Sequence, residues 1–411
     1  MTGRAMHLGL MTPEWYQDEP AGGIATYCRV LAAAAVRFGH RVTVYAATTA
    51  AGRRPLERGR LRVLPVAAQS GQALEWAERF RAVWLATAPA DRPEVLEAAD
   101  FGGVAALLLG DAGSVPVTTR LHLPLASLLR RNDGQRIYRD DSCRLDLERR
   151  QAEGSALLTS PTRWLSAEAT AVWGLTDPPA VIPNPVSPGC LAPAHRAAGG
   201  REGGGRQGGG RESGGCESGG CESSGLPRVL YFGRLEHRKG VLALAEAVAT
   251  HLRRGGPATV TFAGRDTRWR GRSLREQMEE RLSGIPDPDR CRFRPPLRWP
   301  ALRREIDHSD LVVLPSRYEN FPYACLEAMA RGRTVLACSG SGVDEIIASG
   351  TTGHLVAPDD PDALAGALDR LLCDPAALTR TGARARAAVA RFAPHRVVPP
   401  LLARYGGLAA E

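Results

Sequence analysis

The 53 basic residues of the chain include a single lysine, Lys239, which lies in the stretch YFGRLEHRKG at residues 231–240. A lysine ammonium is a compact, mobile point charge, whereas an arginine guanidinium is a wide, planar fork. Arg234 lies in the same stretch, five residues before Lys239. Two cations this close together suit a ligand with dense negative charge, such as a diphosphate. The alternative is an ordinary charged surface loop.

The sequence around this pair predicts a strand that ends at Phe232 and a helix that begins near Gly240. Apolar residues recur at helical spacing in the second segment, at Val241, Leu244, Ala245, Val248 and Leu252. Arg234 and Lys239 would then lie on the loop between strand and helix. The N–H groups and dipole of the helix N-terminus already favour an anion there.

A second group of candidate residues lies in SDLVVLPSRYENFPYACLEAMARG, residues 309–332. The apolar run at 311–314 predicts a buried strand, after which Glu319 falls in a loop and a helix begins. Glu319 could therefore reach a ligand held at the end of the strand. Main-chain N–H groups at the start of the helix could cap a phosphate. This part of the chain contains Asn320, Phe321 and Pro322.

Glu327 stands in the early turns of the same expected helix, eight residues after Glu319. Its carboxylate can accept hydrogen bonds from a pair of vicinal hydroxyls, such as those of a ribose. Its neighbours are small or apolar: Ala324, Leu326, Ala328, Met329 and Ala330. We expect a carboxylate in such surroundings to be buried and partnered. The alternative is an ordinary exposed helix position.

Both halves of the chain show strands alternating with helices, which predicts α/β domains with parallel, doubly wound sheets. In the first half, an apolar run at 6–11 precedes a glycine loop at Gly22 and Gly23 and a helix that ends at Gly39. In the second half, the alternation begins again with the strand at 228–232. Ligands bind at the carboxyl ends of the strands in such folds, so the expected site is a cleft between the two domains.

Four segments are expected along the chain. Residues 1–187 form the N-terminal domain and 227–390 the C-terminal domain, and 391–411 form a helix that packs back on the N-terminal domain. The intervening residues 188–226 are repetitive, rich in glycine and serine, and have little to bury. We expect this stretch to be a flexible insertion or linker.

The net charge of +9 would suit a nucleic acid, a membrane surface or an anionic substrate. The arginine-rich stretch at 130–150 mixes arginines with aspartates, which indicates a solvated helix face, so we expect no nucleic-acid partner. No apolar run approaches the ~20 residues of a membrane span. The N-terminus has too short an apolar stretch for a secretory signal, so a cytoplasmic protein is expected.

These motifs resemble those of the retaining glycosyltransferases of family 4 (glycosyl transferases group 1). That family has the GT-B fold, an α/β architecture in which two Rossmann-like, doubly wound domains face each other across a cleft. Its signature of two glutamates separated by seven residues matches Glu319 and Glu327. Its diphosphate-binding stretch matches four residues here, Gly233, Arg234, Lys239 and Gly240.

The first half of the chain matches the same family less specifically. AGGIATY resembles its first glycine loop, RLHLP its cleft histidine at His122, and VIPNPV its asparagine near the end of the domain at Asn184. The resemblance covers nearly the whole chain apart from the glycine- and serine-rich insertion.

The resemblance implies a nucleotide sugar held mainly by the second domain and an acceptor carried by the first. Arg234 and Lys239 would stabilise the departing diphosphate, so neither a metal nor a cofactor is expected. Glu319 would hold hydroxyls of the transferred sugar, and Glu327 those of the ribose. Two Asp-x-Asp sequences, at 287–289 and 360–362, lie beside prolines and are interpreted as turns.

From the first domain, His122 would face the reacting centre. Gly22 and Gly23 would let the backbone approach the diphosphate or the acceptor closely. The implied donor-binding set is completed by Gly233, Asn320, Phe321, Pro322 and Asn184.

The resemblance also implies retention of the anomeric configuration and a UDP-sugar donor, with UDP-glucose and UDP-N-acetylglucosamine as first expectations. The use of arginine for lysine indicates a high-GC bacterial genome, in which relatives serve natural-product pathways that include antibiotic biosynthesis. We therefore expect a small soluble acceptor such as an aminocyclitol. One alternative is a lipid-linked or polysaccharide acceptor at a membrane surface, which the mixed charge of 125–150 does not favour. Another is a catalytically inactive sugar-nucleotide-binding protein.

Overall fold

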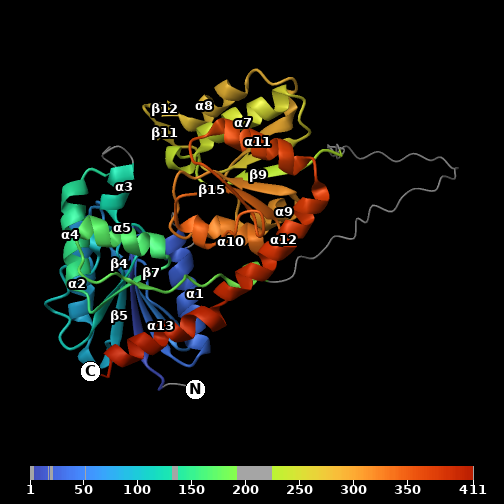
Figure 1. The fold of residues 1–411 in the computed structure, drawn as a ribbon. Coiled ribbons are helices and arrows are strands. Elements are labelled where there is room, and N and C mark those ends of the chain that lie inside the picture. The colour runs from blue at the N-terminus through green and yellow to red at the C-terminus, as the bar shows by residue number, and fades with distance from the viewer. Residues whose placement is uncertain are drawn as a thin grey trace, which may run out of the picture.

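Two α/β domains lie one above the other in Figure 1, and the chain returns to the first domain at its C-terminal end. The structure is a computed structural model and describes residues 4–16, 18, 22–50, 52–131, 138–191 and 225–410. In both domains, helices cover the two faces of a mainly parallel sheet. The strands near the middle of each sheet are buried along almost their whole length, as expected for sheets covered on both sides.

The N-terminal domain contains an eight-stranded sheet of order β3-β4-β2-β1-β5-β6-β7-β8. All neighbours are parallel except β3 and β4. The strands are β1 (His7–Thr12), β2 (Arg41–Thr48), β3 (Leu56–Arg58), β4 (Leu61–Ala67), β5 (Val95–Ala99), β6 (Val117–Arg120), β7 (Leu157–Ser160) and β8 (Ala180–Val181). The helices are α1 (Gly23–Arg37), α2 (Ala73–Ala86), α3 (Leu125–Arg131), α4 (Asp141–Glu153), α5 (Arg163–Trp173) and α6 (Pro188–Leu191).

The C-terminal domain contains a six-stranded parallel sheet of order β13-β10-β9-β14-β15-β16. Its strands are β9 (Arg228–Phe232), β10 (Thr259–Ala263), β13 (Cys291–Arg294), β14 (Leu311–Leu314), β15 (Thr334–Cys338) and β16 (His354–Val356), and β11 (Arg268–Trp269) and β12 (Arg272–Ser273) form a separate hairpin. The helices are α7 (Val241–Arg253), α8 (Leu274–Leu282), α9 (Trp299–His308), α10 (Tyr323–Ala330), α11 (Pro361–Leu372) and α12 (Pro375–Val389). The last helix, α13 (Pro394–Leu408), packs on the N-terminal domain.

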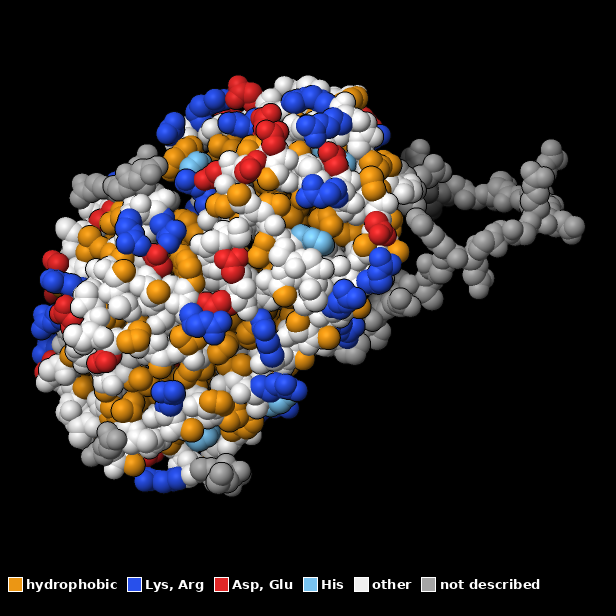
Figure 2. All heavy atoms as spheres, in the orientation of Figure 1, with side chains coloured by type: hydrophobic (Ala, Val, Ile, Leu, Met, Phe, Trp, Pro, Cys, Tyr) orange, Lys and Arg blue, Asp and Glu red, His pale blue; other side chains and the backbone are white. Residues whose placement is uncertain are grey.

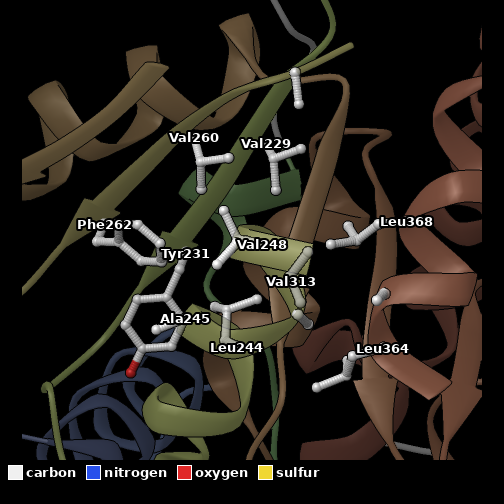
Figure 3. Close-up of a cluster of buried hydrophobic side chains, with 14 of the residues drawn as sticks. Val229, Tyr231, Leu244, Ala245, Val248, Val260, Phe262, Val313, Leu364 and Leu368 are labelled. Carbon is white, nitrogen blue, oxygen red and sulfur yellow. The ribbon is translucent and has the colours of Figure 1, made fainter. Parts of the chain in front are cut away.

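One hydrophobic core of the C-terminal domain lies between its sheet and the helices α7 and α11 (Figure 3). Strands β9 and β10 contribute Val229, Tyr231, Val260 and Phe262, and the two helices contribute Leu244, Ala245, Val248, Leu364 and Leu368. Burying a side chain of this size stabilises the fold by about 1.5–3 kcal/mol. This packing holds the start of α7 at the carboxyl end of β9, where the candidate anion-binding loop lies.

The last helix ties the two domains together. The chain leaves the C-terminal domain through the 3₁₀ turn η6 (Ala390–Phe392), where the carbonyl of Phe392 accepts a hydrogen bond of 2.9 Å from Val186 N. Helix α13 then packs against α1, as Figure 1 shows. At its end, the hydroxyls of Tyr405 and Tyr27 both donate to the buried carboxyl of Glu97 on β5. The N-terminal core is therefore completed by the C-terminal end of the chain.

The structure confirms the prediction of two doubly wound domains and corrects one part of the expected linker. Residues 188–191 form helix α6, with Cys190 buried, because they pack against α10. Most of the remaining expected insertion, 192–224, lies outside the described residues.

The prediction of a solvated helix face at 130–150 holds for one face of α4, where Asp146, Arg149 and Arg150 are exposed, and is wrong for the opposite face. Arg144, Glu148 and Gln151 recur at helical spacing and are all buried. These polar side chains bond to main-chain groups of neighbouring loops, so the face is polar without being solvated. Residues 132–137 of this stretch lie outside the described part of the chain.

On the face shown in Figure 2, basic and acidic side chains are intermingled. That face therefore carries no continuous basic band of the kind that tracks a nucleic-acid backbone. Among the described residues, no helix combines the length and the apolar character needed to cross a membrane.

Candidate active site

A cavity of about 420 Å³ lies between the two domains and is lined by residues of both. It brings together eleven of the twelve residues predicted from the sequence. They are Gly22, Gly23, His122, Asn184, Gly233, Arg234, Lys239, Glu319, Asn320, Phe321 and Pro322. The twelfth, Glu327, does not line this cavity.

Lys239 and Glu319 form an ion pair in the wall of the cavity. Lys239 ends the 3₁₀ turn η3 (His237–Lys239), and Glu319 lies on the loop between β14 and α10. Lys239 Nζ and Ser316 Oγ donate to the same oxygen, Glu319 Oε1, the latter at 2.7 Å. Arg238 Nη1 lies 3.7 Å from the other oxygen. Glu319 is therefore held from two sides.

This network shifts the pKa of both Glu319 and Lys239. Burial alone would raise the pKa of Glu319, but the positive charges of Lys239 and Arg238 outweigh it and lower the pKa to about 2. Burial also lowers the pKa of Lys239, although the adjacent Glu319 opposes that shift. Glu319 is therefore ionised near pH 7, and its carboxylate lies against the side chain of Lys239.

Gly240 allows the two loops to come this close. Its φ is 67°, in the left-handed region that favours glycine. A Cβ added at Gly240 would lie 1.9 Å from the carbonyl oxygen of Pro315, at the end of β14. Any other residue would therefore push η3 away from the loop that carries Glu319.

Arg238 was not identified from the sequence, although it precedes Lys239. Its side chain is almost fully buried, contacts Glu236 and Glu319, and donates to the carbonyl of Tyr318 at 3.2 Å. Arg234 differs, because its side chain is 61% exposed and pairs with Glu236 at 3.1 Å. Arg234 is thus free to turn toward a ligand at the mouth of the cavity, whereas Arg238 is held in place.

His122 forms part of the opposite wall, in the N-terminal domain. Burial lowers the pKa of its imidazole to about 3, and the charge of Arg120 adds to that shift, so the ring is neutral near pH 7. The ring of Tyr27 contacts it edge-on, with 5.3 Å between the centroids. Among the described residues, His122 Nε2 is a buried atom without a hydrogen-bond partner. This nitrogen is available to a ligand.

Asn184 is held in the same wall by Arg120, a residue that the sequence did not point to. Arg120 donates to Asn184 Oδ1 from Nε at 3.2 Å and from Nη2 at 2.5 Å, and to the carbonyl of Ile182 at 2.6 Å. The sequence did contain a signal for Arg120, since it is a charged residue at the end of an otherwise uncharged strand.

The glycine loop brings the start of α1 to the cavity. Gly22 N donates to Glu14 Oε2 at 2.6 Å, and α1 begins at Gly23. A Cβ at Gly23 would lie 3.5 Å from the ring of Tyr323 on α10, so the two domains already contact each other there.

Three further contacts join the domains around the cavity. Asn320 Nδ2 donates to the carbonyl of His122, and the Tyr323 hydroxyl lies 3.4 Å from the carbonyl of Pro185. The carboxylate of Glu345, on the 3₁₀ turn η5 (Gly342–Glu345), accepts from the N–H groups of Arg163 at 3.1 Å and Trp164 at 2.8 Å. A side chain of one domain thus caps helix α5 of the other.

Glu327 departs from its expected surroundings. It is half-buried on α10, and the described residues provide its carboxylate with no hydrogen bond or ion pair. Burial raises its pKa to about 7. It lies one turn after Tyr323, on the face of α10 that meets Pro185 and Cys190. This face packs against the segment that contains Pro185 and Cys190, and no described residue of this segment donates a hydrogen bond to the Glu327 carboxylate.

The two Asp-x-Asp sequences lie at local turns, as interpreted from the sequence. Asp287 accepts from Asp289 N at 3.1 Å, and Asp360 accepts from Ala363 N at 2.8 Å as the cap of α11. Among the described residues, no three His, Cys, Asp or Glu side chains are grouped closely enough to hold a metal ion.

Solved structures share this two-domain arrangement. Sucrose-phosphate synthase from Thermosynechococcus elongatus matches with a TM-score of 0.78 at 21% identity, covering 98% of this chain and 99% of that one. Anabaena HepE in complex with UDP-glucose matches with a TM-score of 0.66 at 19% identity, covering 98% and 100%. These likenesses show the fold, which is the GT-B fold.

Family descriptions match both halves of the chain. "Glycosyl transferase 4-like domain" matches residues 22–185, and "Glycosyl transferases group 1" matches 226–374. The chain therefore belongs to the glycosyl transferase group 1 family, family 4 of the glycosyltransferases.

Curated relatives match over part of their length. Alpha-D-kanosaminyltransferase of Streptomyces kanamyceticus is 35% identical over 36% of this chain and 37% of the relative. Glycogen synthase of Mycobacterium tuberculosis is 37% identical over 41% of this chain and 38% of the relative. D-inositol 3-phosphate glycosyltransferase 1 of Catenulispora acidiphila is 30% identical over 44% and 45%. In each case the match spans less than half of the relative.

The contact of Glu345 with α5 generates a prediction about domain closure. In Glu345→Ala, we expect the domains to separate more readily, because the variant loses both interdomain N–H contacts. The loss of a helix cap costs about 0.5–2 kcal/mol. Small-angle X-ray scattering should therefore give a larger radius of gyration for the variant than for the native chain.

Asp344→Ala is the matched control. Asp344 lies on the same turn but accepts from Gly340 and Ser341 within its own domain. It should leave the radius of gyration unchanged. Equal radii for Glu345→Ala and the native chain would contradict the role assigned to Glu345.

Proposed function

We propose that this protein is a retaining glycosyltransferase that moves a hexose or an N-acetylhexosamine from a nucleoside diphosphate sugar to a small acceptor. The supporting observation is the group of cations on the loop after β9 and on η3, which lies beside a cavity lined by both domains. Three cations, Arg234, Arg238 and Lys239, are balanced there by two carboxylates, Glu236 and Glu319. The remaining positive charge suits an anionic ligand.

The proposed chemistry depends on charge that appears as the anomeric C–O bond breaks. The departing diphosphate gains negative charge, and fixed cations in a site shielded from water stabilise that charge more than the intact donor. Lys239 and Arg234 are assigned this task, and Arg238 holds Glu319. The N-terminus of α10 near Asn320, Phe321 and Pro322 supplies further N–H donors.

Hydroxyl recognition is assigned to the carboxylates. Glu319 is charged and lies in the cavity wall, so it can accept from hydroxyls of the transferred sugar. Glu327 is proposed to accept from the ribose hydroxyls, which would give its carboxylate the partner that it lacks. Because Glu327 lies outside the cavity lining, this role requires the ribose to extend past the cavity toward α10. The neutral imidazole of His122 can exchange a hydrogen bond with the sugar or the acceptor without adding charge near the anomeric carbon.

Retention of the anomeric configuration is proposed to arise because the acceptor attacks the anomeric carbon from the same face that the diphosphate leaves. The acceptor oxygen would bond to the anomeric carbon as the C–O bond to the diphosphate breaks, and a phosphate oxygen would take the acceptor proton. Glu319 already pairs with Lys239, so it is not assigned the role of covalent nucleophile. A glycosyl–enzyme adduct detected by mass spectrometry would contradict this route.

UDP is proposed as the nucleotide and an aminocyclitol-type small molecule as the acceptor, with a place in natural-product biosynthesis. Two similarities support this choice. The structurally similar HepE was solved in complex with UDP-glucose, and two sequence relatives bear the names of a kanosaminyltransferase and an inositol-phosphate glycosyltransferase. A lipid-linked acceptor remains the second candidate, and incubation with anionic liposomes followed by sedimentation would distinguish it.

A panel of nucleoside diphosphates and nucleotide sugars tests the proposed function. A ligand that binds only the folded chain stabilises it by about 2.7 kcal/mol at 100 times its Kd. We therefore expect UDP and at least one UDP-sugar to raise the melting temperature, and uridine to leave it unchanged. Failure of every nucleoside diphosphate and sugar nucleotide to do so would contradict the proposal.

Replacing the single lysine tests why it is a lysine. Lys239→Arg keeps the charge, but a planar guanidinium cannot occupy the compact position between Glu319 and a diphosphate. Loss of one charged hydrogen bond costs about 1.5–3 kcal/mol. We therefore expect kcat/KM for the donor selected by the panel to fall by about 10- to 100-fold.

The reverse exchange Arg272→Lys is the control, because Arg272 is exposed and pairs with Glu280 on the surface of the same domain. It should change kcat/KM less than about twofold, as surface ion pairs contribute little. A fully active Lys239→Arg would show that the site needs only a positive charge.

A further inference from the structure

A row of polar side chains on α4 is buried behind His122. Arg144, Glu148 and Gln151 share one face of the helix. This face lies at the carboxyl ends of β5 and β6, where two loops begin. One is the 3₁₀ turn η2 (Phe101–Gly103), and the other carries His122.

Glu148 joins these two loops through main-chain hydrogen bonds. Its Oε1 accepts from Gly102 N at 2.9 Å, and its Oε2 accepts from Leu125 N at 2.7 Å. One carboxyl group therefore fixes a point on each loop, and Leu125 lies three residues after His122.

Asp100, the residue after β5, holds the near side of the same loop. Its two oxygens accept from His122 N at 2.9 Å and from Leu123 N at 3.1 Å. Gln151 adds a third link, since it accepts from Ala105 N at 2.7 Å and donates to the carbonyl of Ala99 at 2.9 Å. The main chain from His122 to Leu125 is thus held at three N–H groups by buried acceptors.

The glycines of η2 allow α4 to approach. Gly102 and Gly103 have φ values of 75° and 60°, and a Cβ at Gly103 would lie 2.4 Å from the carbonyl carbon of Leu147. Only glycine permits this contact, which brings Glu148 within reach of Gly102 N.

Two carboxyl groups buried beside each other are costly for the fold. Burial raises the pKa of Asp100 to about 7 and that of Glu148 to about 8, and the charge of Asp100 adds to the rise at Glu148. A buried ionisable group destabilises a fold unless its bonds compensate. Here the bonds go to the main chain beside His122, whose own Nε2 lacks a partner among the described residues.

We propose that Glu148 and Asp100 are positioning residues, which hold the main chain at His122 and in the three residues that follow it, so that its free ring nitrogen points at the reacting centre. This inference rests on the proposed function, because it takes His122 as a group that contacts the substrate. It assigns a task to the helix face that the sequence indicated was merely solvated.

The test compares transfer kinetics of the native chain, Glu148→Gln, His122→Ala and the double variant, with the UDP-sugar selected by the panel as donor. A displacement of a catalytic group by about 1 Å can lower the rate about 100-fold. We expect Glu148→Gln to lower kcat by about 10- to 100-fold and to leave KM for the donor within about twofold. In the His122→Ala background, Glu148→Gln should lower kcat by less than about twofold.

Asp141→Asn is the matched control. Asp141 lies on the same helix, is buried, and accepts from Tyr138 N at 2.9 Å, away from His122. It should leave kcat within about twofold of the native value. If Glu148→Gln does not fold, Asp100→Asn replaces it, since an amide NH2 then stands in place of one of the two oxygens that accept from His122 N and Leu123 N.

A second measurement does not depend on activity. With ¹³C at Cε1 of every histidine, the NMR resonance that disappears in His122→Ala identifies this ring. We expect this resonance to shift or broaden in Glu148→Gln and to stay unchanged in Asp141→Asn. A native chain that transfers no sugar would overturn the proposed function, and the NMR comparison would still test whether Glu148 positions the ring.

Two results would overturn the inference itself. One is a Glu148→Gln variant with native kcat and a native His122 resonance. The other is an equal loss of kcat from Glu148→Gln with and without His122, because that would show a general structural defect.

Discussion

The ion pair between Lys239 and Glu319 is the interaction on which the rest of the site depends. The desolvation of two charges in a protein interior is repaid only when both are well hydrogen-bonded. Here Ser316 and Arg238 provide these further contacts. The pair requires the loops after β9 and β14, which are neighbours in the sheet, to come together at their carboxyl ends. The hydrophobic core fixes α7 at the end of β9, and Gly240 leaves room for the loop at Pro315, so the two loops can approach each other.

The N-terminal domain supplies the opposite wall of the cavity. His122 and Asn184 reach the cavity from the ends of N-terminal strands, and the backbone of His122 contacts Asn320 directly. Helix α13 crosses back to complete the N-terminal core, so the C-terminal end of the chain also links the two domains. In a cavity lined by both domains, each fixed charge acts more strongly than it would in bulk water.

The elements with one strong periodicity could be predicted from the sequence. Strand β9, helix α7 and strand β14 have apolar runs that predict them directly. The glycines at 233 and 240 mark the loop between β9 and α7. The loops that carry Lys239 and Glu319 were found because a single lysine and a pair of glutamates stand out by residue type. The cavity residues of the N-terminal domain, such as His122 and Asn184, were predicted from the resemblance to the family instead.

Other features depend on contacts that no local pattern contains. Glu327 sits among small apolar residues in the sequence, but the phase of α10 turns it toward the connector between the domains. The polar face of α4 looks solvated in the sequence, because its partners are main-chain N–H groups of loops far away along the chain. Arg238 has no distinguishing pattern in the sequence, and only the structure shows that its side chain is buried beside Glu319.

The affinity of UDP for Glu319→Gln, measured by isothermal titration calorimetry, tests the central claim most directly. If Lys239 serves the diphosphate and Glu319 competes with it for the ammonium, removal of the carboxylate charge must strengthen UDP binding. We predict a fall in Kd of about tenfold, equivalent to about 1.4 kcal/mol. An unchanged or weaker affinity would show that the ion pair does not lie at the diphosphate site.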